Sequence, residues 1–129
     1  MMETCERSIA GCRLVVPNEP WFILPSPNQE DYDGCCGAGE SGGWRERVVP
    51  EHILGLRVSV ACYIHDRWWA MCDRTLAEFR QSNRVMLDNI LEINRVHGGP
   101  WLVRMARLPV IAFWGVCLGT RKALENFLR

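Results

Sequence analysis

The residues with the clearest chemical potential in this chain of 129 residues are the adjacent His65 and Asp66. A neutral imidazole can take a proton from water, and a carboxylate can hold a cation beside it. Cys62 precedes Asp66 by four positions, so on a helix their side chains share one face. A lone inward-facing histidine is more often a satisfied core residue. The interpretation of this pair therefore depends on whether the chain can build a cation site next to it.

A segment rich in cysteine and glycine, residues 35–39 with the sequence CCGAG, could supply such a site. Glycine tolerates conformations that turn backbone carbonyls inward, and calcium prefers several hard oxygen ligands. A disulfide between Cys36 and Cys62 would draw these carbonyls across the helix face that carries Asp66. The alternative is that both cysteines are reduced core residues, which is common for cysteine. The sequence thus permits a calcium site made from loop carbonyls and one carboxylate.

A histidine that acts as a base needs an orienting partner on its second ring nitrogen. The apolar periodicity predicts a facing helix, and Asn83 is the polar residue in the middle of its buried face. Asp88 lies about 140° around the same helix, so it should face solvent. Asp73 is two turns away from His65 along the first helix. Asn83 is therefore the predicted partner of His65.

These residues are expected in one domain that spans the whole chain and is mainly α-helical. An antiparallel helix pair is predicted over residues 53–96, with the second helix running from about Thr75 to a Gly-Gly-Pro stop at 98–100. A further helical region, bent at Pro109, should occupy residues 101–129. Residues 1–50 contain many prolines and glycines, and we expect an irregular N-terminal arm that includes the glycine-rich loop.

The combined pattern resembles the phospholipase A2 family in its compact viral, phage or prokaryotic form. There, a Cys-Gly-x-Gly calcium loop is followed by Cys-x-x-His-Asp on a helix. The matching stretches here are residues 32–39 (YDGCCGAG) and 62–66 (CYIHD). Trp69 stands where family members often carry an aromatic residue, and residues 82–86 (SNRVM) resemble the later Ala-Asp-x-x-Phe segment. The resemblance covers residues 32–90.

The resemblance implies calcium-dependent hydrolysis of the sn-2 ester of phospholipids, with His65 activating water and Asn83 orienting it. It also implies a disulfide between Cys36 and Cys62. The implied calcium ligands are three loop carbonyls and one carboxylate: Cys35, Gly37, Gly39 and Asp66. The protein would then be a hydrolase of lipid degradation that works at a membrane interface.

Two departures from the family pattern bear on activity. The connection from loop to helix, residues 40–57, is longer than in the compact secreted enzymes. Asn83 replaces the aspartate that orients the histidine; an amide cannot balance an imidazolium and can favour the wrong tautomer, and such a change in a serine-protease triad costs about 10⁴ in rate. The resemblance therefore implies lowered activity or none, and Asn83→Asp should raise turnover. The alternative is an inactive phospholipase-like protein with a structural or interaction role in a virion or other assembly.

Composition limits the partners and the location. The formal net charge is zero, which argues against a dedicated nucleic-acid binder. We find no signal-peptide pattern, and the longest nearly unbroken apolar run, residues 108–118, is too short to span a bilayer. Seven cysteines are an odd number, so either the thiols stay reduced in the cytoplasm or disulfides form after release in another way, as in a phage particle. We therefore expect a virion-associated protein that contacts virion or tail proteins, or otherwise a cytoplasmic one.

A phospholipid membrane surface is the other expected partner. Residues 95–129 carry six bases and one acid, which suits an anionic surface. Aromatic and arginine side chains in the second half of the chain could form an interfacial surface: Trp68, Trp101, Phe113, Trp114, Arg104, Arg107 and Arg121. The alternative is that the aromatic residues belong to the core and the arginines are simply solvated.

Overall fold

The computed structural model describes residues 2–33 and 52–128, and the protein is mainly α-helical, as the sequence predicts. The α-helices of this part are α2 (Ser59–Met71), α3 (Leu76–His97), α4 (Trp101–Leu118) and α5 (Arg121–Leu128). The strands are β1 (Thr4–Ile9), β2 (Cys12–Pro17), β3 (His52–Ile53) and β4 (Leu56–Arg57), and a short 3-10 helix, η1, spans Gln29–Tyr32.

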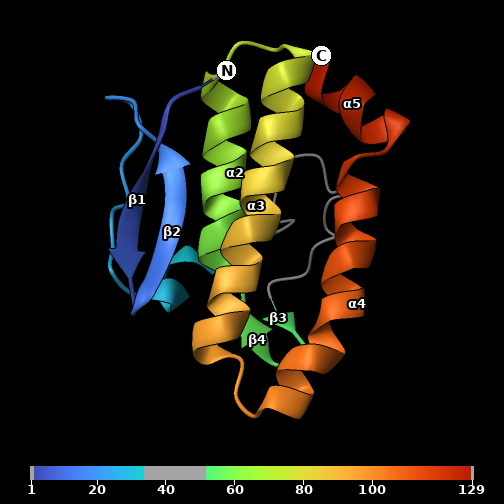
Figure 1. Cartoon of the computed structure of the whole chain (residues 1–129). Coiled ribbons are helices and arrows are strands. Elements are labelled where there is room, and N and C mark those ends of the chain that lie inside the picture. Colours follow the sequence, from blue (N-terminus) through green and yellow to red (C-terminus); the bar gives the residue numbers. More distant parts are fainter. Residues whose placement is uncertain (1, 34–51, 129) are drawn as a thin grey trace.

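Helices α2 and α3 lie side by side and run in opposite directions, so they form the expected antiparallel pair (Figure 1). Thr75 caps α3, because its Oγ1 accepts a hydrogen bond of 3.2 Å from the backbone N–H of Glu78. Helix α2 begins later than the predicted helical stretch. Residues 52–57 instead form the small hairpin β3–β4, whose turn residues Leu54 and Gly55 have φ angles of 48° and 83°.

The N-terminal region is not irregular throughout, and the prediction of an irregular arm is wrong for residues 4–17. Strands β1 and β2 form an antiparallel hairpin joined by Ala10 and Gly11, whose φ angles of 52° and 82° suit a tight hairpin turn. Strand β2 alternates in the way a half-buried strand requires, and it packs on α3. The Asn89 side chain of α3 extends the pairing, since it accepts from the N–H of Val15 at 2.8 Å and donates to the same residue's carbonyl at 2.9 Å.

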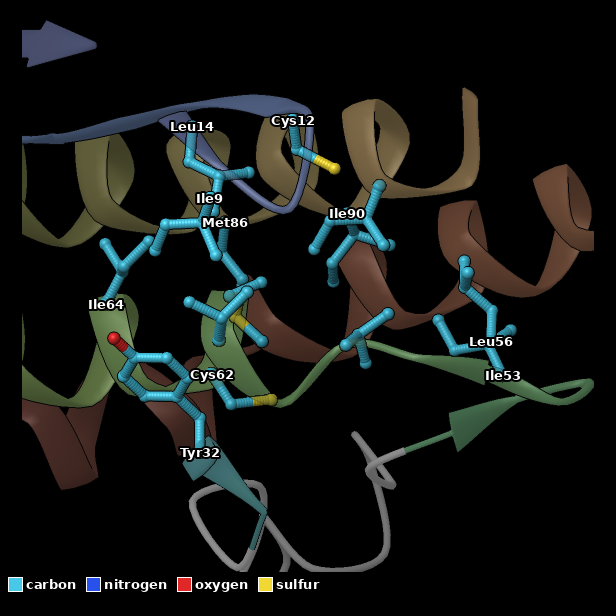
Figure 2. Packing of buried hydrophobic residues seen from close by; sticks show 14 of the residues in the cluster. Ile9, Cys12, Leu14, Tyr32, Ile53, Leu56, Cys62, Ile64, Met86 and Ile90 are labelled. Carbon is cyan, nitrogen blue, oxygen red and sulfur yellow. The ribbon is translucent and has the colours of Figure 1, made fainter. Parts of the chain in front are cut away.

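The main core lies where the hairpin β1–β2 and the helix pair meet. Figure 2 shows Ile9 and Leu14 from the hairpin beside Met86 of α3, with Ile64 of α2 nearby. Tyr32 of η1 is also buried and closes this core toward α2. Polar side chains that must be positioned accurately on α2 and α3 are therefore supported by packed apolar neighbours on both helices.

Helix α4 packs against α3 on the side of the helix pair away from the hairpin (Figure 1), and it continues through Pro109. The approach is close, because a Cβ on Gly115 would lie 2.7 Å from Cδ1 of Leu87 on α3. Within residues 2–33 and 52–128, α4 is the one helix that is long and apolar enough to cross a membrane by length and composition alone. One of its faces is buried against the domain, which is consistent with the expectation of no membrane-spanning segment.

Candidate functional site

His65 lies on the face of α2 that meets α3, and its exposed fraction is 2%. Its Nε2 atom is 2.8 Å from Oδ1 of Asn83, across the helix pair. The contact predicted from the helical periodicity is therefore present. Asp88 is exposed, as expected, and Asp73 is exposed at the start of the connection to α3.

The orientation of the Asn83 amide follows from its second partner. Its Nδ2 atom lies 3.0 Å from the carbonyl oxygen of Leu118, the last residue of α4. A carbonyl oxygen can only accept a hydrogen bond, so the amide nitrogen must face Leu118 and the amide oxygen must face His65. Because that oxygen also only accepts, the proton of the neutral ring sits on Nε2 and the lone pair sits on Nδ1. Asn83 thus selects the same tautomer that an aspartate would select, contrary to the concern raised by the sequence.

The second ring nitrogen of His65 points toward the carboxylate of the next residue. Nδ1 of His65 lies 3.8 Å from Oδ1 of Asp66, whose side chain is 29% exposed against 2% for His65. This distance is too long for a direct hydrogen bond. The pair therefore places a basic nitrogen beside a carboxylate that solvent or a cation can reach.

Aromatic side chains hold the imidazole in place. The ring of Trp69, one turn along α2, lies 4.5 Å from the ring of His65 between centroids, at 46°. Trp69 is itself held, because its Nε1 donates a hydrogen bond of 2.8 Å to Oγ of Ser82. Phe127 of α5 packs against Trp69 from the other side, with 5.0 Å between the ring centroids. Helix α5 thus supports the Trp69 ring that packs against His65.

The predicted calcium loop is not part of the described structure. Cys35, Cys36, Gly37 and Gly39 lie outside the described residues, so their assigned roles stay predictions. Cys62 lies on α2 one turn before Asp66 and is disulfide-bonded. The proposed pairing with Cys36 therefore stays a prediction as well.

Four other cysteines in the described part of the chain are free thiols: Cys5, Cys12, Cys72 and Cys117. Burial raises the pKa of Cys12 and of Cys72 to about 11, with the nearby carboxylates of Glu92 and Glu78 adding to the effect. Both remain protonated at neutral pH, so neither is a reactive nucleophile. Within residues 2–33 and 52–128, no three His, Cys, Asp or Glu side chains gather into a metal-binding group.

Arg107 on α4 forms a second buried polar network that the sequence did not reveal. Its exposed fraction is 5%. Its guanidinium donates hydrogen bonds of 2.9 Å to the carbonyl oxygens of Ile53 and Leu54, 2.6 Å to that of Gly98 and 3.0 Å to Oδ1 of Asn94. These partners come from the hairpin β3–β4 and from the end of α3. Arg107 is therefore a structural cross-link, not part of the predicted arginine surface.

The carbonyl of Leu118 is the feature of the site that sequence reasoning missed. Every residue has a backbone carbonyl, so no side-chain pattern could mark this one. No protein-family model matches the chain, and neither the curated proteins nor the solved structures compared with it show a match. The function is therefore argued from the residues of this site.

Proposed function

We propose that the protein hydrolyses the sn-2 ester of phospholipids by calcium-dependent, phospholipase A2-like chemistry, with His65 as the general base. The supporting observation is the chain of contacts from the Leu118 carbonyl through the Asn83 amide to Nε2 of His65. These two bonds leave the Nδ1 lone pair available on the side of Asp66. A general base requires an oriented ring with a basic nitrogen, and this arrangement meets that requirement.

The protein's own residues would carry the proton in the following way. Nδ1 of His65 takes a proton from a water molecule as the water oxygen bonds to the ester carbonyl carbon, while Oδ1 of Asn83 holds the proton on Nε2. When the ester C–O bond breaks, the imidazolium returns the transferred proton to the departing alcohol oxygen. The imidazolium that forms faces a neutral amide on one side, where a family aspartate would supply a full charge. The carboxylate of Asp66, 3.8 Å from Nδ1, is the nearest counter-charge described. The amide therefore orients the ring but gives weak electrostatic support, and we expect lowered turnover.

Calcium is the proposed cofactor, and the carboxylate of Asp66 suits it because hard cations prefer oxygen ligands. Asp66 is partly exposed and lies one turn after the disulfide-bonded Cys62. The remaining proposed ligands are the carbonyls of Cys35, Gly37 and Gly39, tied to α2 by a disulfide from Cys36. When bound, calcium would polarise the ester carbonyl and stabilise the developing oxyanion.

The test is fatty-acid release from mixed phospholipid micelles with calcium. We expect slow release that EDTA abolishes, and a loss of about 10²–10⁴ in rate with His65→Gln. His52→Gln is the matched control, because His52 is exposed and should retain activity. No release by the unaltered protein at any calcium concentration would sink the proposal. It would favour the inactive scaffold with a structural or interaction role.

We further propose a phage particle as the location, with virion or tail proteins as neighbours. The support comes from the disulfide-bonded Cys62. Disulfides persist in oxidising surroundings outside the cytoplasm, and such a particle would deliver a lipid esterase to a host membrane.

A further inference from the structure

Helix α4 carries an exposed face made only of apolar residues. At 100° per residue these side chains fall on one side of the helix, and all of them are exposed: Leu102, Met105, Ala106, Pro109, Ala112, Phe113 and Val116. The exposed fractions of Leu102, Phe113 and Val116 are 65%, 63% and 71%. The opposite side of α4 holds the buried Arg107, Ile111 and Trp114. We call the first set the α4 apolar face.

Basic residues outnumber acidic residues in the part of the sequence that contains α4. Residues 95–129 contain six bases and one acid, Glu125, which lies 3.5 Å from Arg121 as an ion pair. Of these bases, Arg121 and Lys122 are exposed on α5 and Arg104 is half-buried on α4, whereas Arg107 is buried. The charge next to the face is therefore positive, which complements an anionic surface.

A groove between α3 and α4 adjoins the α4 apolar face. It has a volume of about 280 Å³ and is lined by four apolar side chains, one asparagine and two arginines: Leu91, Trp101, Met105, Leu108, Asn94, Arg95 and Arg104. Arg104 makes a long hydrogen bond of 3.4 Å to the carbonyl of Arg95. Among the described residues, its Nε is a buried side-chain nitrogen without a hydrogen-bond partner. The groove therefore combines apolar side chains with two arginines, and in the described part of the chain the buried Nε of one of them, Arg104, has no hydrogen-bond partner.

The absence of hydrogen-bonding side chains favours lipid over a protein partner. Protein interfaces carry about one hydrogen bond per 100–200 Å² and a polar rim. The seven side chains of the α4 apolar face offer no hydrogen-bonding group, whereas acyl chains need none. Trp101, at the start of α4, is 64% exposed, and tryptophan prefers the level of lipid headgroups.

We infer that α4 is an interfacial helix that lies flat on an anionic phospholipid surface, with its apolar face among the acyl chains and its basic neighbours among the headgroups. It does not cross the bilayer, because its other face is anchored in the domain through Arg107. Helix α4 ends at Leu118, whose carbonyl binds Asn83, so the docked helix reaches the His65 site. The inference that this surface delivers an esterase to lipid rests on the proposed function. Binding of the protein to vesicles is measured separately, without turnover.

The experiment is co-sedimentation with vesicles in EDTA, using the full chain with Phe113→Glu and Val116→Glu together. The unaltered protein should bind vesicles of phosphatidylglycerol and phosphatidylcholine more tightly than vesicles of phosphatidylcholine alone. The double variant should bind at least about 100-fold more weakly, since two large apolar side chains no longer enter hydrocarbon. Leu102→Glu is a second variant from the other end of the face and should weaken binding in the same direction.

The matched control is Ala70→Glu with Ala77→Glu, which adds the same charge at exposed sites of α2 and α3. This control should retain vesicle binding. Equal weakening in the control and in the Phe113 and Val116 variant would assign the effect to net charge and overturn the inference. So would a lack of vesicle binding by the unaltered protein, or a dimer in light scattering that the double variant dissociates. Vesicle binding without fatty-acid release would contradict the proposed function alone.

Discussion

Two buried polar networks hold α4 against the rest of the protein, and they differ in what they leave unused. In the first half of α4, Arg107 donates to three carbonyl oxygens and one side-chain amide oxygen. At its end, the Leu118 carbonyl accepts from Asn83, which in turn accepts from His65. Both networks join α4 to other elements, and both are shielded from solvent.

The two networks differ in which of their hydrogen-bond donors and acceptors have partners. The four partners of Arg107 described above are neutral oxygens. The guanidinium is always protonated, so this network has no proton to exchange. The His65 network fixes one ring nitrogen as a donor and thereby makes the other a base beside Asp66. Burial of a polar group alone thus does not indicate function. The basis of the proposed function is instead the oriented ring of His65, whose Nδ1 lies on the side of Asp66.

The largest expected effect comes from Arg107→Met. It leaves the carbonyls of Ile53, Leu54 and Gly98 buried without their donor, and should lower the free energy of unfolding by roughly 3–5 kcal/mol. Urea denaturation measures this loss. Arg80→Met, at an exposed position of α3, is the control and should change stability by less than about 0.5 kcal/mol. An Arg107→Met midpoint equal to that of the control would contradict the structural role.

A smaller effect, dependent on pH, is expected from Asn83→Asp. The new carboxyl faces the Leu118 carbonyl on one side and His65 on the other. The new carboxyl and the imidazole of His65 must together keep one more proton than a carboxylate beside a neutral imidazole. Without that proton, the core would hold an unbalanced negative charge. A group that keeps its proton in the folded state has a raised pKa there. The stability that it contributes is fully present below its pKa in the unfolded state, and this stability is lost as the pH rises through its pKa in the folded state. The variant should therefore lose about 1–3 kcal/mol between pH 5 and pH 8 relative to the unaltered protein.

The control for this substitution is Asn18→Asp, which makes the same change at an exposed site. It should show no such pH dependence. If Asn83→Asp is as stable as the unaltered protein at pH 8, the Leu118 contact does not orient the side chain at position 83. The structure also changes the expectation from sequence, because the carbonyl of Leu118 now opposes the carboxylate that was expected to raise turnover.

The smallest effect concerns which ring nitrogen of His65 carries the proton. In ¹⁵N NMR of the neutral unaltered protein, His65 should show a protonated Nε2 and an unprotonated Nδ1. Replacing the amide by Asn83→Ala should remove this preference, whereas the spectrum of the exposed His52 should stay the same. A proton on Nδ1 in the unaltered protein would reverse the two roles assigned to the ring.

The sequence by itself determined the helix pair and its central contact. Helical periodicity places His65 and Asn83 on facing stripes, and Thr75 and the Gly-Gly-Pro at 98–100 mark the ends of α3. It also carried the signal for the β1–β2 hairpin, since Cys12, Leu14 and Val16 alternate with less buried residues. The frequent prolines and glycines further along the chain mask this signal, because they favour an irregular arm.

Only the tertiary structure decided how the polar groups are used. The Leu118 carbonyl lies beside the Asn83 amide and thereby orients it. On α4, Arg107 and Trp114 are buried, whereas Phe113 is exposed. These outcomes depend on how α4 is rotated and how closely it approaches α3. Local periodicity specifies which side chains share a face of α4, but which face turns inward is set by packing against residues far away in the chain.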